Sequence, residues 1–265
     1  MELFWRCRPR SIALRSRAPL NWSAGAVDDL GVDVESYALA HGVRSTRAAL
    51  RTWQQRPWSV LGGWLAGSLF AAGVLLAAVW VIAALSPAGE AFALRRPPLV
   101  VGGLGDVGRI LSRNALVLAL HAMACVAGFI AGSSLPLQAQ HRSGLARWVH
   151  EHGGRFALLF VATATAFSLS VQALVLGLTV RDVSSALSTS PGILLLGLIP
   201  HAVPELSALF LPLAAWIIAS RRGEWDRLLA ATVVTVGAAI PVLVLSAFWE
   251  VYVAPHVLQG LIGYD

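Results

Sequence analysis

The chain has 265 residues, of which 57% are hydrophobic and only 13% are charged. This composition excludes a disordered chain and indicates an integral membrane protein. The formal charge of +6 comes from basic residues that are all arginine, and the two cysteines, Cys7 and Cys125, are too few for a disulfide framework.

Residues 1–60 are polar and basic, with five arginines and no acid between Arg6 and Arg17. Residues 28–55 have only a weak apolar periodicity, which predicts one or two surface helices that end at Pro57. We therefore expect a separate basic segment over residues 1–60.

Five apolar runs follow, at about residues 61–85, 114–135, 156–180, 192–219 and 228–249. Each reaches the roughly 20 residues that a helix needs to cross the hydrocarbon layer. A helix satisfies its own backbone hydrogen bonds, which lipid cannot do. The sequence thus predicts an all-α bundle of five transmembrane helices, a transmembrane domain over residues 61–255 and a short outer tail over residues 256–265.

The arginines orient this bundle. Segments 1–60, 136–155 and 220–227 hold fifteen of the 20 basic residues, and segments 86–113, 181–191 and 250–265 hold five. Positive residues favour the cytoplasmic side. We expect a multi-pass protein of the inner (plasma) membrane with a cytoplasmic N-terminus. The basic excess is then a topology signal, and no nucleic-acid partner is expected.

The segment between the first two runs is long and only moderately polar. Residues 99–111 could form an interfacial helix. Residues 103–108 fit the Gly-x-Gly-x-x-Gly pattern. We expect no dinucleotide site there, because that site needs a strand, turn and helix in a parallel sheet.

The fourth run contains His201 and Glu205, which an i, i+4 spacing places on one helix face. Ionisable residues at this depth cost about 2.5–3.5 kcal/mol on insertion scales. Pro200 and Pro204 precede them, and with Pro212 they predict a kinked, tilted or split helix. The pair could titrate in transport or serve helix packing. Two ligands make only half of a helical metal site, so no metal or other cofactor is expected.

Glu250 follows an aromatic pair at the end of the last run. It could lie at the membrane interface or turn into the bundle. The predicted orientation places it in the same half as His201, so we expect Glu250 to approach the 200–205 segment. Asn114 and His121 are seven residues apart and share a helix face, which indicates interhelical hydrogen bonds. Together these residues form a predicted intramembrane polar cluster.

Small side chains in the second run indicate close helix packing. Gly128 and Gly132 have the small-xxx-small spacing. In the third run, Gln172 indicates another hydrogen bond between helices. No Walker A sequence, nucleophile arrangement or carboxylate pair suited to hydrolysis is present, so we predict no enzymatic activity.

Two segments carry a family resemblance. Residues 200–208 read Pro-His-Ala-Val-Pro-Glu-Leu-Ser-Ala, and residues 248–255 read Phe-Trp-Glu-Val-Tyr-Val-Ala-Pro. They resemble the Pro-His-Gly-x-x-Glu-Leu-Pro-Ala and Glu-Ala-Phe-x-Thr-Pro segments of the stage II sporulation protein M family. Asn114 fits an asparagine that opens an earlier span there. The resemblance covers about residues 110–255, and it departs at Ala202, where the family has glycine, and at Pro204.

The resemblance implies a membrane scaffold that works with cell-wall hydrolases in peptidoglycan remodelling. Relatives are often encoded beside AAA+ ATPases and von Willebrand-type domain proteins, which implies an assembly partner. The leading hypothesis is therefore a non-enzymatic membrane protein that anchors a complex with membrane or envelope proteins, or with further copies of itself. The alternative is a subunit of a transporter or channel that uses the His201 and Glu205 pair.

Overall fold

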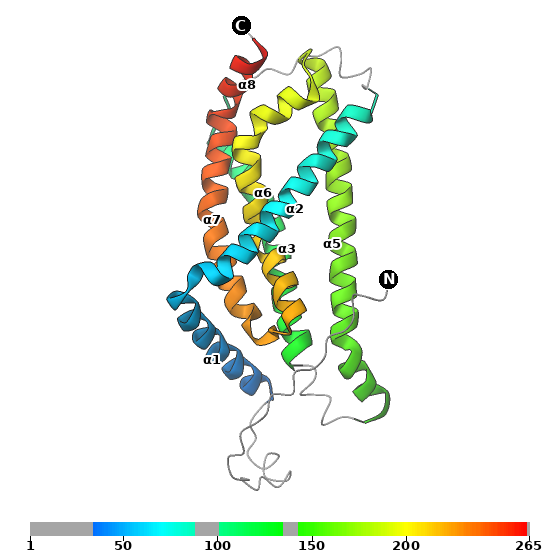
Figure 1. The fold of residues 1–265 in the computed structure, drawn as a ribbon, viewed down its shortest axis with the longest axis vertical. Helices are drawn as coiled ribbons and strands as arrows, with labels where there is room; N and C mark the ends of the chain where they lie inside the picture. Colours follow the sequence, from blue (N-terminus) through cyan, green and yellow to red (C-terminus); the bar gives the residue numbers. More distant parts are fainter. Residues whose placement is uncertain (1–33, 88–100, 135–142, 264–265) are drawn as a thin grey trace. The chain divides into compact units, whose positions relative to one another are not determined.

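In the computed structural model, residues 34–87, 101–134 and 143–263 are described, and every regular element among them is helical. The elements are α1 (Val34–Gln55), α2 (Pro57–Leu85), α3 (Leu104–Phe129), the π-helical turn η2 (Ile130–Ser134), α5 (Gly144–Ala186), α6 (Pro191–Arg222), the 3-10 turn η3 (Trp225–Arg227), α7 (Leu228–Tyr252) and α8 (Ala254–Ile262) (Figure 1). Among the described residues, five helices are long and apolar enough to cross a membrane. The predicted all-α fold with five spans is confirmed.

The chain divides into two compact units, residues 1–39 and 40–265. Of the first unit, only residues 34–39 at the start of α1 are described. The second unit contains the rest of α1 and all five spans. Within this unit, Trp53 of α1 packs edge-on against Trp64 of α2 with ring centroids 5.2 Å apart. Ala49 is buried in the same cluster.

Helix α6 is the central helix of the bundle and packs against α2, α3 and α7. In the most apolar stretch of 18 residues in α6, 61% of the residues are buried. In the corresponding stretch of α5, only 6% are buried. Helix α5 packs mainly on α2. It therefore leaves most of its apolar surface open to lipid or to another protein.

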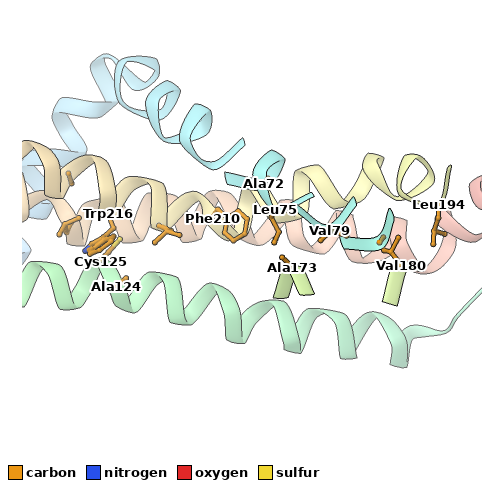
Figure 2. Close-up of a cluster of buried hydrophobic side chains, with 14 of the residues drawn as sticks. Ala72, Leu75, Val79, Ala124, Cys125, Ala173, Val180, Leu194, Phe210 and Trp216 are labelled. Atoms are coloured by element: carbon orange, nitrogen blue, oxygen red, sulfur yellow. The ribbon is translucent and has the colours of Figure 1, made fainter. Parts of the chain in front are cut away.

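The largest core cluster fills the space around α6 (Figure 2). Helix α2 contributes Ala72, Leu75 and Val79, which recur every three or four residues and so face one side. Phe210 of α6 is only 1% exposed within this cluster. The small alanine allows close contact, and the aromatic ring fills the volume between the helices.

Helix α3 begins earlier than the apolar run suggested. The N–H of Gly103 donates to Oδ2 of Asp106 at 2.9 Å, which starts the helix at Leu104. Arg109 forms an ion pair with Asp106 at 2.7 Å in the next turn. Of the helix predicted over residues 99–111, the part from Leu104 onward is present as the first turns of α3, and residues 99 and 100 lie outside the described part. The Gly-x-Gly-x-x-Gly pattern of residues 103–108 therefore lies at the start of helix α3.

Helix α6 is continuous in spite of its prolines. It starts where Ser190 Oγ accepts from the N–H of Ile193 at 3.2 Å, and it ends at Arg222, which Gly223 follows with φ 68°. Of the three predicted forms, a kinked, tilted or split helix, the split is excluded, because each proline removes only one backbone donor and the other bonds continue. Figure 1 shows that the ribbon of α6 changes direction in its N-terminal part, as a kinked helix does.

The predicted outer tail is a helix that packs back on the bundle. Helix α8 contacts α6 and α7, and Leu258 is buried. A side-chain carbon placed on Gly197 of α6 would collide with Leu258, so this glycine allows α8 to approach. Residues 254–262 are therefore part of the membrane domain's packing.

The glycine pair of the second span accommodates tryptophan rings. A Cβ built on Gly128 would lie 2.8 Å from Trp216 Nε1 and 2.9 Å from Leu228 Cδ1, and one on Gly132 would collide with Trp225. The two glycines therefore make room for large side chains of α6, η3 and α7.

We expect Gly128→Ala to lower the free energy of unfolding by about 1–3 kcal/mol through overpacking. The matched control is Gly73→Ala in α2, where a Cβ meets nothing within 4 Å. This control should be neutral or stabilising by up to about 1 kcal/mol, because alanine favours helix. Unfolding by SDS in mixed micelles measures both. Equal effects of the two substitutions would contradict the packing described for Gly128.

Candidate functional site

Helix α6 places two ionisable side chains on one face of the central span. His201 lies ten residues after the start of α6 at Pro191, about 15 Å along its axis at 1.5 Å per residue. Its side chain is buried, with 6% exposure, and Glu205 one turn later is half-buried. Both therefore lie well inside the span.

Helix α7 supplies the third ionisable group. Glu250 lies in the last turn of α7, which ends at Tyr252. One ligand atom from each of His201, Glu205 and Glu250 lies within 4.8 Å of the others. The predicted approach of Glu250 to the 200–205 segment is confirmed. Its carboxylate turns into the bundle, although Trp249 beside it is partly exposed.

Helix α3 adds a hydrogen-bond donor. Asn114 is 9% exposed, and its Nδ2 donates to Oε1 of Glu205 at 2.8 Å. The N–H of Gly102, just before α3, donates to the carbonyl of Val251 at 3.4 Å. This bond places the start of α3 beside the end of α7, which brings Asn114 to the depth of Glu205. We call His201, Glu205, Glu250 and Asn114 the polar cluster.

The fifth predicted member, His121, has a different partner. Its Nδ1 lies 2.8 Å from the carbonyl oxygen of Leu209 in α6. One turn later on α3, the Cys125 thiol donates to the carbonyl of Pro212 at 3.2 Å. The predicted interhelical contact of His121 is present, but its partner is the backbone carbonyl of Leu209 and not a member of the polar cluster. Both contacts join α3 to the turn that Pro212 disturbs.

Sequence reasoning considered Cys125 only as a possible disulfide partner and missed its contact with α6. Pro212 cannot donate to the carbonyl of Ala208, but the carbonyls that His121 and Cys125 contact belong to Leu209 and Pro212. The proline therefore gave no signal for these two contacts. The pairing of the two spans follows only from the packed structure.

The polar cluster contains two acidic side chains and one histidine. Two carboxylates lie close together in a half-buried place, and like charges at this separation repel when both are ionised. Nδ1 of His201 is buried and has no hydrogen-bond partner among the described residues. Arg113, adjacent to Asn114 in the sequence, is exposed. Such a site can hold a proton or a metal cation.

Pro200 and Pro204 lie beside the polar cluster. Each lacks a backbone donor, which leaves the carbonyls of Leu196 and Pro200 without their usual helical partner. The bend of α6 and the cluster therefore occur in the same stretch of the helix.

No protein-family model, curated protein or solved structure matches this chain. The role of the site consequently rests on its own geometry.

Proposed function

We propose that the chain is a non-enzymatic multi-pass membrane protein that anchors a partner complex. The observation that supports this role is the use of polar side chains inside the spans. Asn114, His121 and Cys125 all lie on α3, and all three contact α6. Interhelical hydrogen bonds of this kind fix the helices of a bundle in one arrangement. A rigid bundle is what an anchor requires.

The surface of α5 supports the same role. Helix α5 is the least buried of the five spans, and Phe167 at its middle is 72% exposed. In a membrane, such a face is covered by lipid or by another transmembrane helix. It therefore offers room for a membrane partner or a second copy of the chain.

The resemblance to the stage II sporulation protein M family extends the proposal to the envelope. Under this proposal the anchored complex acts in envelope or peptidoglycan remodelling. The arginine distribution favours the inner membrane with the N-terminus in the cytoplasm. The polar cluster then lies in the outer half of the membrane.

Copurification from native membranes tests the anchoring role. The tagged full-length chain is crosslinked in intact cells and extracted in mild detergent, and copurifying proteins are identified by mass spectrometry. We expect a membrane or envelope protein in near-stoichiometric amount. A tagged unrelated five-span protein of the same membrane is the control. Recovery of the chain with only the background of that control would contradict the proposal.

A transporter or channel subunit is the second candidate, because three ionisable groups converge inside the spans. Reconstitution into proteoliposomes separates it from the first. Flux of protons or metal cations that Glu205→Gln abolishes, while the variant still folds, would support transport. Absence of flux would leave anchoring as the better account.

A further inference from the structure

We propose that the polar cluster binds one divalent first-row transition cation, with Zn²⁺ as its best representative. His201 and Glu205 of α6 and Glu250 of α7 are the ligands. This inference goes beyond the anchoring role and does not depend on which partner the chain holds.

The donor set fits this class of cation. Zinc accepts imidazole nitrogen and carboxylate oxygen, and sites with three protein ligands and one open position are common. The sequence alone offered only His201 and Glu205, which is half of a helical site. Folding adds Glu250 from another helix as the third ligand. Calcium prefers six to eight oxygen ligands and magnesium a near-ideal octahedron, so neither fits as well.

The three ligand atoms must move closer together to bind one zinc ion. Two ligands of a tetrahedral zinc ion, each about 2.1 Å from it, are about 3.4 Å apart. The three ligand atoms lie within 4.8 Å of one another. Rotation of the two glutamate side chains about their own bonds can close this gap without movement of the helices.

The state of His201 is an independent observation that indicates a ligand. The side chain is 6% exposed, and Nδ1 has no partner among the residues that the structure describes. Buried polar atoms are nearly always bonded, so such an atom requires an explanation. Because a ring nitrogen of the same residue lies among the carboxylates, a bound cation would engage the imidazole.

Asn114 supports the site without being a ligand itself. Its amide holds Oε1 of Glu205 at 2.8 Å. Ligating carboxylates in metal sites are usually hydrogen-bonded in this way, and loss of such a partner costs about 10–100-fold in affinity. Two ionised carboxylates also carry the charge that a divalent cation neutralises.

Metal content tests this proposal. The full-length chain is reconstituted in nanodiscs, stripped with EDTA, equilibrated with Zn²⁺ and analysed by mass spectrometry for bound metal. We expect about one zinc ion per chain and no displacement by excess Mg²⁺. His201→Gln and Glu250→Gln should each weaken zinc binding by at least about tenfold, and Asn114→Ala by about 10–100-fold.

His121→Gln is the matched control, because His121 is also a histidine inside a span but contacts a backbone carbonyl. It should keep the zinc. Zinc held by histidines elsewhere in the chain would survive the cluster substitutions. Retained binding in the His201 and Glu250 variants would therefore overturn the proposal.

Two further measurements require no variant. Zinc at about one hundred times its Kd should raise the Tm of the stripped wild-type chain by about 5–10 °C. Bound Co²⁺ should show the visible absorption of a low-coordinate site. A wild-type chain that binds no zinc and shows no Tm shift would overturn the metal site, whatever copurification reveals about the partner.

Discussion

Asn114→Leu should lower the free energy of unfolding by about 1–3 kcal/mol. Hydrogen bonds between membrane helices average about 0.6 kcal/mol, so this value is large for one side chain. The substitution would leave the half-buried Glu205 carboxylate without this hydrogen-bond donor. Glu205 keeps its place within 4.8 Å of the Glu250 and His201 ligand atoms but loses the 2.8 Å bond from the amide.

Gln172→Leu on α5 is the matched control. Gln172 also carries an amide inside a span, but its amide donates to Ser168 of the same helix at 3.1 Å. This substitution should change stability by less than about 0.5 kcal/mol. SDS titration in mixed micelles compares the two variants. A similar small change in both would show that the bond between Asn114 and Glu205 contributes nothing to the bundle.

Phe210→Ala should destabilise the chain by about 2–4 kcal/mol. Phe210 is 1% exposed in the centre of the α6 core, and its ring lies 5.7 Å from that of His121 between centroids. Lipid is as apolar as the core, so the transfer contribution is small in a membrane. The cavity contribution remains, at about 24 cal/mol per Å³ of unfilled volume.

Phe167→Ala provides the comparison for this prediction. Phe167 has the same side chain and also lies inside a span, but it is 72% exposed on α5. Its removal opens no cavity, so stability in the same SDS titration should change by less than about 0.5 kcal/mol. If both phenylalanines proved equally dispensable, α6 would not be the packed centre of the bundle.

The number and type of the spans could be predicted because lipid imposes simple rules. About 20 apolar residues must form a helix, and the five runs satisfied this condition. The helix ends could not be predicted in this way. Helix α3 begins at Leu104 through the bond between Gly103 and Asp106, and α5 begins at Gly144, well before its apolar run. Polar turns extend a helix beyond the hydrocarbon, where apolarity gives no signal.

Which site residues share a helix face could be predicted from helix geometry alone. His201 and Glu205 share a face because they are one turn apart. Glu250 was placed beside them because both segments fall in the same half of the membrane. The partners of Asn114 and His121 depend on how α3 is rotated against α6. That rotation follows from side-chain packing, which a single sequence does not reveal.

The convergence of α6 and α7 at the polar cluster is tested most directly by a double-mutant cycle. His201→Gln, Glu250→Gln and the double variant are compared for stability in metal-free nanodisc or mixed-micelle preparations. Contacting residues in one network couple by about 0.5–3 kcal/mol, and distant residues add within about 0.3–0.5 kcal/mol. We predict a coupling above 0.5 kcal/mol for this pair. His201 with Glu224, which pairs with Arg227 after the other end of α6, should be additive. Additivity of His201 and Glu250 as well would contradict the polar cluster.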